Sequence, residues 1–308
     1  MILCCGEALI DMIPAPTVRG PEGFVPHAGG AVFNTAIALG RLGARAGMLT
    51  GLSTDMFGRQ LLEALEASHV DTALVLESSR PTTLAFVRLV DGHASYSFFD
   101  ENSAGRMLEP AAMPELPTEV SALFFGGISL ASEPCADAYA ALLEREGAGR
   151  AVMLDPNIRP RFIADEARYR ARLERMLAQA DIVKVSDEDL NWLLPDPLSL
   201  QQKAAALLER GPSVVILTRG GEGATGYLAS GAKVRVPAVR AEIADTVGAG
   251  DTFNAGVLAK LSGLGQLTKP ALAALPPETL EQALEHGARV AAVTVSRPGA
   301  NPPWAAEL

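Results

Sequence analysis

The chain has 308 residues, enough for one large α/β domain or two smaller ones, and 48% of them are hydrophobic, so it can bury a substantial core. The formal net charge of −10 and a pI near 5.0 argue against nucleic acid or an anionic membrane as the main partner. No apolar run is long enough to span a bilayer, and Glu7 and Asp11 interrupt the opening stretch too early for a secretory signal, so we expect a cytoplasmic protein.

Short apolar runs alternate with helical patterns along the chain. We predict strands at residues 1–6, 46–52, 121–127, 151–157, 181–186 and 213–220, and helices at residues 33–43, 58–69, 136–147 and 199–211. Strands that alternate with helices form βαβ units, whose strands are parallel and whose helices cover the sheet. The pattern therefore predicts an α/β fold with a mainly parallel sheet covered on both faces.

The three cysteines are Cys4, Cys5 and Cys135. The first two are adjacent in an apolar run, where they are poorly placed to bridge each other. We expect all three to be small core residues of a protein from a reducing compartment, in preference to a metal or redox role.

Two segments break the alternation of strands and helices. Residues 82–100 are typical of two strands around a turn at Asp91-Gly92, and residues 12–28 are rich in proline and glycine without a helical period. We expect both segments to form a small accessory sheet over one edge of the main sheet. An exposed apolar face on that sheet would need cover, which predicts a homodimer formed through the two small sheets. The side chains expected on that face are Leu84, Phe86, Tyr96 and Phe98.

Polar residues follow three of the predicted strands directly. They lie at residues 155–159, 186–189 and 218–220. Ligands of open α/β sheets bind at the carboxyl ends of the strands, so three such clusters in one chain favour a site over ordinary loops.

A glycine pattern of the dinucleotide-binding type, Gly221, Gly223 and Gly226, follows the strand at residues 213–220. That fingerprint requires a helix directly after it. The residues that follow, 227–236, are instead typical of a second hairpin. We therefore interpret the pattern as a glycine-rich turn, which weakens the hypothesis of a nicotinamide-dependent oxidoreductase.

The segment 245–256, "DTVGAGDTFNAG", runs from small residues into a carboxylate and then into a helical pattern. The spacing places Gly248, Ala249, Gly250 and Asp251 in the first turn of a helix, where backbone amides lack internal partners and attract anions. Asp251 at a helix start is compatible with a simple cap, but capping alone does not require the small residues before it. Phosphoryl transfer to an alcohol requires both an amide-lined hole and a base, so we interpret the segment as the centre of such a reaction.

The same segment resembles the C-terminal signature of the ribokinase-like (phosphofructokinase B type) carbohydrate kinases. Residues 29–61, "GGAVFNTAIALGRLGARAGMLTGLSTDMFGRQL", resemble the N-terminal signature of that family. The opening "GEALIDM" and the final "VTVSRPGANPP" are similar to it as well, so the resemblance covers essentially the whole chain. Among the subgroups, "YSFFDENSAGRML", "DPNIRPRF" and "DIVKVSDEDL" are most similar to bacterial fructokinases.

The resemblance implies a single domain over residues 1–308: a three-layer Rossmann-like α/β sandwich with a β-sheet lid formed by about residues 12–28 and 82–100. It implies ATP with Mg²⁺ as phosphoryl donor and a sugar hydroxyl as acceptor. Asp251 would be the catalytic base, and Gly248, Ala249 and Gly250 would form the anion hole. The residues that would meet the sugar or its phosphate are Asp11, Gly29, Gly30, Asn34 and Arg159.

The nucleotide side implied by the resemblance consists of Lys184, Thr218, Arg219, Gly220 and Gly223, which would lie near the phosphates and ribose. Close to the adenine, His286 is a candidate purine contact, although a histidine on the helix surface fits the pattern equally well. These residues would complete the binding site for ATP.

Two metal sites are implied by the resemblance. The family commonly has Asn-x-x-Glu where this chain has Ser186 and Asp189, so the carboxylate that helps to order Mg²⁺ and its waters is either Glu188 or Asp189. Some relatives use K⁺ beside the anion hole, and the matching candidates are Asp245 and the carbonyl of Val247.

The sequence thus predicts an ATP-dependent kinase that phosphorylates a primary hydroxyl, with fructose as the expected acceptor. 2-Keto-3-deoxygluconate kinase and ribokinase are the alternatives within the same class. A sugar or nucleotide sensor without catalysis is the alternative from another class, and the intact Gly248–Asp251 segment argues against it.

Overall fold

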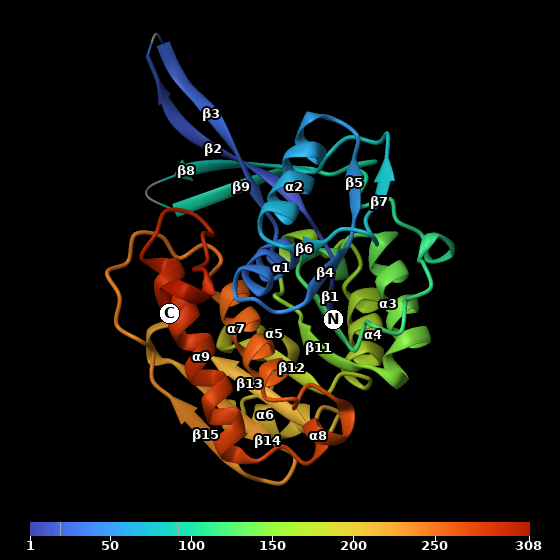
Figure 1. Cartoon of the computed structure of the whole chain (residues 1–308), viewed down its shortest axis with the longest axis vertical. Helices are drawn as coiled ribbons and strands as arrows, with labels where there is room; N and C mark the ends of the chain where they lie inside the picture. The colour runs from blue at the N-terminus through green and yellow to red at the C-terminus, as the bar shows by residue number, and fades with distance from the viewer. Residues whose placement is uncertain (19, 91–92) are drawn as a thin grey trace.

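The computed structural model describes residues 1–18, 20–90 and 93–308. Within them, a nine-stranded sheet forms the centre of the molecule, in the order β15-β14-β13-β12-β11-β10-β1-β4-β6 (Figure 1). The pairs from β13 through β6 are parallel, whereas β14 and β15 are antiparallel additions at one edge, so the predicted mainly parallel sheet is confirmed. The strands are β1 (Ile2–Cys5), β4 (Ala46–Leu49), β6 (Val70–Asp71), β10 (Ala122–Gly126), β11 (Ala151–Asp155), β12 (Ile182–Ser186), β13 (Val214–Thr218), β14 (Ala224–Leu228) and β15 (Lys233–Val236).

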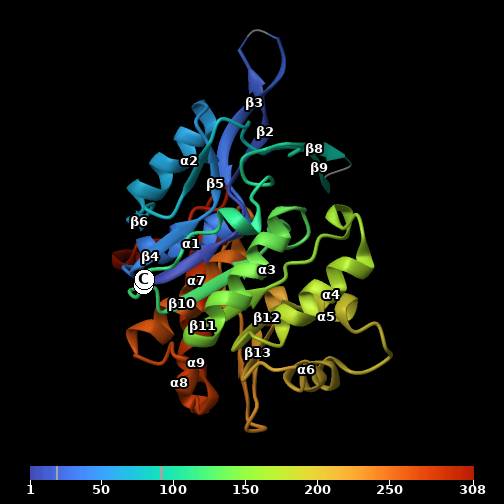
Figure 2. The ribbon, with the colours of Figure 1, turned by 90° about the vertical axis from the view of Figure 1, so that its right-hand side faces the viewer.

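Helices cover both faces of this sheet, as Figure 2 shows from the side. One layer contains α1 (Ala31–Arg41), α2 (Met56–Ala67), α7 (Ala249–Gly263), α8 (Lys269–Ala273) and α9 (Pro277–Val295). The other contains α3 (Cys135–Glu146), α4 (Glu166–Leu177), α5 (Asp187–Leu193) and α6 (Leu200–Leu208). The four helices expected between the strands are α1, α2, α3 and α6, each displaced by no more than three residues at either end, and the helix expected at Gly248–Asp251 is α7.

The strands alternate their side chains between two apolar cores. Ile2 and Cys4 pack against the α1–α7–α9 layer, whereas Leu3 and Cys5 pack against the α3–α4 layer. Side chains of successive strand residues point to opposite faces, so a strand that is buried on both faces must be apolar throughout. All three cysteines are buried and free, as the sequence predicted.

The strand predicted at residues 46–52 is two strands in different sheets. β4 ends at Leu49, and β5 (Gly51–Ser53) pairs with β7 (Leu76–Ser78) in a separate two-stranded sheet. An apolar run indicates that a segment is buried but not that the chain passes from one sheet to another. The break at Thr50 was therefore not predictable from the pattern.

A four-stranded sheet lies beyond the carboxyl end of β1, at the top of Figure 1. Its order is β3-β2-β8-β9, with β2 (Leu9–Thr17), β3 (Gly20–Gly29), β8 (Leu84–Val90) and β9 (His93–Phe99). The two extended segments therefore do join in one small sheet, which begins at Leu9 and not at residue 12. The turn predicted at Asp91-Gly92 lies outside the described residues.

The strand register corrects the prediction of which side chains form the apolar face of the small sheet. Leu84 and Phe86 pair with Phe99 and Ser97, which places them on one face, whereas Phe98 lies opposite Ala85 on the other face. Phe98 lines the cavity described below, and Leu84 and Phe86 are half-buried. The side chain of Tyr96 lies outside the described part. The exposed aromatic residues on the outer face are Phe24 and Phe99, which both contact Phe86 edge-on.

The glycine-rich turn after β13 leads into the antiparallel pair β14–β15 and not into a helix. This confirms that Gly221, Gly223 and Gly226 are not a dinucleotide-binding fingerprint. No helix in the described residues is both long and apolar enough to cross a bilayer.

Candidate active site

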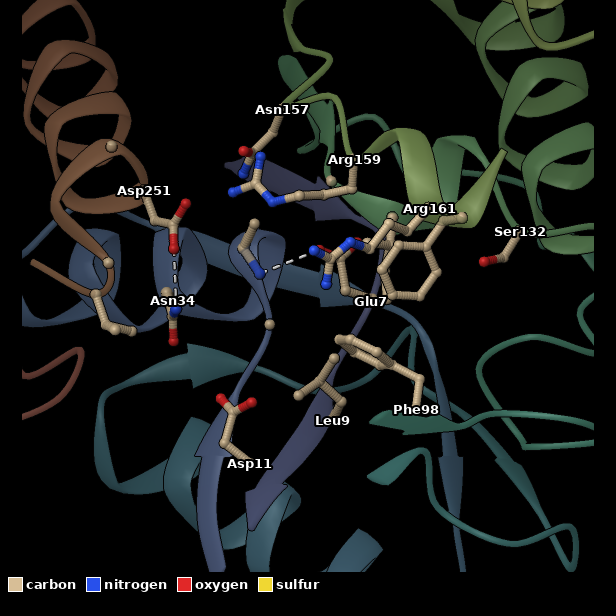
Figure 3. A pocket seen from close by; sticks show the side chains of 18 of the residues that line it. Glu7, Leu9, Asp11, Asn34, Phe98, Ser132, Asn157, Arg159, Arg161 and Asp251 are labelled. Carbon is tan, nitrogen blue, oxygen red and sulfur yellow. Dashed lines mark hydrogen bonds between the residues drawn. The ribbon is translucent and has the colours of Figure 1, made fainter. Parts of the chain in front are cut away.

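A cavity of about 910 Å³ lies between the carboxyl ends of the central strands and the small sheet. Figure 3 shows its walls: Asp251 and Asn34 on one side, Arg159 and Asn157 across from them, and Asp11 projecting from the small sheet. The structure therefore brings together residues that are far apart in the chain. The predicted residues that line the cavity are Asp11, Gly30, Asn34, Arg159, Lys184, Val247, Gly248, Ala249, Gly250 and Asp251.

The start of α7 forms one end of this cavity. Gly248 is the N-cap and not a first-turn residue, with φ 78° and ψ 0°, a left-handed conformation that glycine adopts without strain. A Cβ there would also lie 2.6 Å from the Cβ of Ala300, so the closing segment of the chain packs directly against this turn. The amide of Ala249 donates to the carbonyl of Thr246 at 3.3 Å, a long hydrogen bond for which an incoming anion would compete.

Asp251 is buried and is held by α1. Its Oδ2 accepts a hydrogen bond from Nδ2 of Asn34 at 2.9 Å, and its backbone carbonyl accepts one from Oγ1 of Thr35 at 3.1 Å. Burial raises the pKa of Asp251 to about 7, and the carboxylate of Asp155 adds to the rise against the opposing effects of Asn34 and Lys184. A carboxylate that titrates near neutral pH is suited to accept a proton.

A buried network lies behind the first turn of α7. Nζ of Lys184 is 3.0 Å from Oδ2 of Asp155, and the same oxygen accepts from Nδ2 of Asn254 at 2.7 Å. A Cβ on Gly250 would lie 3.3 Å from Nζ of Lys184, so the ammonium group is directly beside the first turn of α7. Burial acts to lower the pKa of Lys184, but Asp155 and Asp189 outweigh it, and the pKa is raised. The side chain therefore stays charged.

Asp155 and Asn254 were not predicted as site residues. Asp155 belongs to a polar cluster that the sequence did indicate, because it ends a strand. Asn254 carries no such signal, since its partner Asp155 is 99 residues away.

The small sheet contributes the wall opposite Asp251. Asp11 on β2 reaches into the cavity, and a Cβ on Gly29 would collide with its Oδ2, so the glycine leaves room for the carboxylate. Burial raises the pKa of Asp11 to about 6. Gly29 and Gly30 link β3 to α1, which joins the small sheet to the helix that carries Asn34.

Two arginines follow β11 on the third wall. Arg159 was predicted; Arg161 was missed, although it stands in the same "DPNIRPRF" stretch, and both line the cavity. Phe162, in the same loop, packs against Phe98 of the small sheet, with 4.4 Å between the two ring centroids. The loop with the arginines is thus in contact with β9.

The residues predicted for the nucleotide lie outside the lining of this cavity, apart from Lys184. Thr218 ends β13 beside Ser186 of β12. Arg219, Gly220 and Gly223 form the following turn, closed by hydrogen bonds from the Arg219 amide to the Gly223 carbonyl and from the Gly223 amide to the Gly220 carbonyl.

His286 lies half-buried on α9. Burial, with Arg289 and Lys260 nearby, lowers its pKa, so the ring is neutral at pH 7.

The candidate metal carboxylates differ in availability. Oδ1 of Asp189 accepts from the amide of Ile158 at 2.8 Å, and Oδ2 accepts from the amide and hydroxyl of Ser186, so this side chain is the capping box of α5. Glu188, one residue earlier in the same first turn, is exposed.

Asp245 holds the turn before α7. Its carboxylate accepts from the amides of Val247 and Gly299, each at 3.0 Å. No group of three or more His, Cys, Asp or Glu side chains suited to a metal is found among the described residues.

The three-layer α/β fold, the amide-rich helix start and the buried carboxylate are the features expected of a phosphotransferase of the sugar kinase type. The chain matches the pfkB family carbohydrate kinases over residues 1–307. It belongs to that family and is a carbohydrate kinase.

Fructokinases are prominent among its relatives. The chain is 53% identical over 289 residues to a fructokinase of Rhizobium leguminosarum bv. trifolii, covering 93% of this chain and 86% of that protein. Fructokinase with bound ATP from Xylella fastidiosa has a TM-score of 0.89 at 30% identity, over 97% of this chain and 93% of that one. A Vibrio cholerae fructokinase in a fructose-, ADP- and potassium-bound form has a TM-score of 0.83 at 26% identity, with 97% and 93% coverage.

Proposed function

We propose that this chain is an ATP-dependent fructokinase that transfers the γ-phosphoryl group to a primary hydroxyl of fructose. The 53% identity to a fructokinase supports fructose as acceptor, and the ATP-bound and fructose-bound relatives support both ligands. The observation that carries the proposal is the buried Asp251, which faces the cavity at the start of α7 with Asp11 on the opposite wall. We also propose a cytoplasmic location, which the three free, buried cysteines favour.

Asp251 acts as the general base in this reaction. It accepts the proton of the sugar hydroxyl as the hydroxyl oxygen forms a bond to the γ-phosphorus, and the bond from that phosphorus to the bridging oxygen of ADP breaks. Asn34 orients the carboxylate through the 2.9 Å hydrogen bond to Oδ2. The other oxygen, Oδ1, is the one directed to the substrate.

The amides at the start of α7 stabilise the charge that develops on the transferred group. Gly248 and Gly250 leave the helix terminus open to an anion, and the helix dipole favours negative charge there. Lys184 adds a buried positive charge beside Gly250, and Arg159 supplies a guanidinium from the loop after β11.

The sugar is held by Asp11, Gly29, Gly30 and Asn34. The carboxylate of Asp11 accepts hydrogen bonds from two sugar hydroxyls, and the amide of Asn34 both donates and accepts. Gly29 lies against the carboxylate of Asp11, and Gly30 precedes the helix that carries Asn34. We propose that the small sheet acts as a lid and that the whole chain functions as a single kinase domain.

Mg²⁺ fits the residues present. Because Asp189 is fully engaged as a helix cap, Glu188 is the carboxylate available to order the ion and its waters. Mg²⁺ in kinase sites is held mainly by nucleotide phosphates and water with one or two carboxylates, so a larger cluster of ligands is not required. When bound, the ion neutralises charge on the phosphates of ATP.

The remaining ATP contacts are assigned to the turn after β13 and to α9. Thr218, Arg219, Gly220 and Gly223 lie near the phosphates and ribose in this proposal, and the neutral ring of His286 contacts the purine. K⁺ would bind beside the anion hole, held by Asp245 and the carbonyl of Val247. A potassium-bound fructokinase among the relatives supports K⁺ as a ligand.

The outer face of the small sheet supports a homodimer. Phe24 and Phe99 are 43% and 58% exposed there and pack on Phe86. Contiguous exposed aromatic surface on a small sheet is costly in a monomer and is removed when two such faces pack together. We propose that two copies associate through this face.

The experiment that tests the function is a coupled ADP-release assay with separate acceptors. Fructose, ribose, 2-keto-3-deoxygluconate and glucose are each titrated at saturating ATP and Mg²⁺. We expect the highest kcat/KM for fructose. A clearly higher value for 2-keto-3-deoxygluconate or ribose would refute fructose as the acceptor and leave the kinase class intact.

A further inference from the structure

Glu7 is a carboxylate in the cavity wall that the proposed reaction does not use. It lies in the turn between β1 and β2, and it lines the cavity between Gly30 and Gly127. Oε1 accepts a hydrogen bond from the amide of Ala31 at 3.1 Å, and Oε2 accepts one from the amide of Ser129 at 3.2 Å. One of these bonds is drawn in Figure 3. The two oxygens thus join two segments that lie 24 and 122 residues from Glu7 along the chain.

Both amides belong to helix starts that have no cap of their own. Ala31 begins α1 after Gly30, and Ser129 lies in the 3₁₀ turn η2 (Ile128–Leu130) after Gly127; neither glycine can supply a capping side chain. The backbone carbonyl of Glu7 also accepts from the amide of Phe33 at 3.2 Å. Uncapped first-turn amides are costly when water is excluded, so Glu7 supplies from a distance what an N-cap residue supplies locally.

The two glycines are shaped to this carboxylate. Gly30 has φ 110°, and a Cβ there would lie 2.9 Å from the carbonyl oxygen of Glu7. Gly127 has φ 70°, and a Cβ there would collide with Oε1 of Glu7. At both positions the backbone passes so close to Glu7 that a residue with a side chain would not fit.

The start of α1 determines where two contacts to Asp251 are made. Asn34 and Thr35, in the first and second turns of this helix, hold the side chain and the carbonyl of Asp251 respectively. A shift of Ala31 relative to η2 would move both contacts. Small displacements of a catalytic group slow the reaction strongly, because a misplacement of about 1 Å can lower the rate roughly 100-fold.

We propose that Glu7 is a positioning residue of the kinase reaction: its two oxygens fix the start of α1 against η2, and through Asn34 and Thr35 they fix Asp251 facing the acceptor. This inference rests on the proposed function. It concerns how the base is oriented and assigns no contact between Glu7 and the substrate.

Burial raises the pKa of Glu7 itself, against the hydrogen bonds that its carboxylate accepts from Ala31 and Ser129. In its ionised form, Glu7 also acts on the base. It adds to the rise in the pKa of Asp251, together with Asp155 and against Asn34 and Lys184. Glu7 also acts on Cys135 and Tyr139 of α3, whose pKa values burial raises and Glu7 raises further, so both are neutral near pH 7. The other charged side chains that line the same cavity include Asp100, Arg106, Arg159 and Arg161. Removing the charge at Glu7 therefore lowers the pKa of Asp251.

The test compares Glu7→Gln with the matched surface variant Glu63→Gln, on the exposed side of α2. The amide of glutamine keeps one acceptor but turns an N–H towards one of the two helix starts. For folded Glu7→Gln we expect kcat with fructose to fall between about 10- and 100-fold and the acid limb of kcat/KM to move to lower pH. Hydrogen exchange at the amides of Ala31 or Ser129 should accelerate. Glu63→Gln should match the wild type in all three measurements.

A purely structural role gives a different pattern. Glu7→Gln would then lower the unfolding temperature but leave kcat and the acid limb unchanged, and that result would overturn the proposal. Wild-type protein that releases no ADP with any sugar acceptor would refute the proposed function itself, and this inference with it. Wild-type turnover with unaltered Glu7→Gln kinetics would refute the role of Glu7 alone.

Discussion

Opposing interactions determine the pKa of Asp251. Burial and the charge of Asp155 favour its protonated form, whereas the hydrogen bond from Asn34 and the charge of Lys184 favour the ionised form. The outcome is a carboxyl with a pKa of about 7, well above the value of 3.8 for an exposed aspartate. A carboxylate with this pKa is partly ionised at neutral pH and is suited to accept a proton from an alcohol in the transition state.

The first prediction is the pH dependence of activity. Because the base must be ionised in the free enzyme, kcat/KM for fructose should decline below pH about 7 and approach a tenfold fall per pH unit at lower pH. A pH series of initial rates at low fructose, with saturating ATP, measures this limb. A flat profile from pH 5.5 to 8 would contradict the assignment of Asp251 as the base.

The second prediction is that removing the charge of Asp251 increases the free energy of unfolding. The pKa of Asp251 is raised by folding, so the unfolded chain holds fewer protons between pH about 4 and 7, and wild-type stability falls as pH rises through that range. The cost is complete above pH about 7. Asp251→Asn removes it and should be more stable at pH 8, by up to about 4 kcal/mol on the shift alone.

Thermal unfolding of both proteins at pH 8 and pH 5 checks this second prediction. The advantage of Asp251→Asn should shrink at pH 5, because the wild-type carboxyl is then largely protonated in the fold. An Asn variant that is less stable at pH 8, or that differs by the same amount at both pH values, would argue against the raised pKa.

The sequence predicts the residues of the site best where a local pattern carries the chemistry. Gly248, Ala249, Gly250 and Asp251 were predicted from small residues next to a helix start, and all of them line the cavity. Glu7, Asp155 and Asn254 were not assigned, since their importance comes from partners as far as 122 residues away. Which of Glu188 and Asp189 is free was likewise not decidable without seeing the bonds that Asp189 makes.

At the scale of elements, the site depends on α7 being braced from two directions. On one side α1 contacts the helix start through Asn34 and Thr35. On the other, the closing segment packs Ala300 against Gly248 and donates from the Gly299 amide to Asp245. Nζ of Lys184 lies beside Gly250 in the first turn of α7.

The third prediction concerns this first turn. In Gly250→Val, the new Cβ would lie 3.3 Å from Nζ of Lys184, and the branched side chain would cover the amides proposed to bind the phosphoryl group. We expect turnover to fall by at least about 100-fold, comparable to the loss of an oxyanion-hole donor. Gly263→Ala at the other end of the same helix, where a Cβ would meet nothing within 4 Å, is the matched control.

Steady-state rates of the two folded glycine variants decide this third prediction. Near-normal kcat in Gly250→Val would show that the phosphoryl group does not approach these amides.

Elements were predictable where one period continued for a full helix or strand. Six of the strands of the main sheet and four helices were located from such patterns. The run at residues 46–52 was misread, because apolarity does not reveal that the chain changes sheets at Thr50. The parallel pairing of β2 with β8 joins segments more than 70 residues apart, and only the structure gives its register.

At the scale of the whole molecule, the small sheet has two different faces. One face lines the cavity with Asp11 and Phe98, and the other exposes Phe24 and Phe99 to solvent. A lid that binds the sugar on one side and a second subunit on the other would couple association to the shape of the sugar site. The sequence indicated an apolar face, but the strand register shows which side chains form it.

The fourth prediction tests the outer face. Phe99→Glu places a charge in the proposed dimer interface and should yield monomers at micromolar concentration, measured by light scattering. Leu198→Glu replaces an exposed apolar residue between α5 and α6 and should leave association unchanged. Wild-type protein that is itself strictly monomeric under these conditions would remove the dimer proposal.

The assignment of Asp251 as the base is tested most directly by its isosteric replacement. Asparagine keeps the shape and a hydrogen-bonding group but cannot accept the proton, so Asp251→Asn should lower kcat for fructose by at least about 100-fold, the usual range for a general base being 10² to 10⁴. Fructose affinity, measured by titration calorimetry, should change much less. A folded Asp251→Asn protein that retains near-normal kcat would show that Asp251 is not the base and only begins the helix.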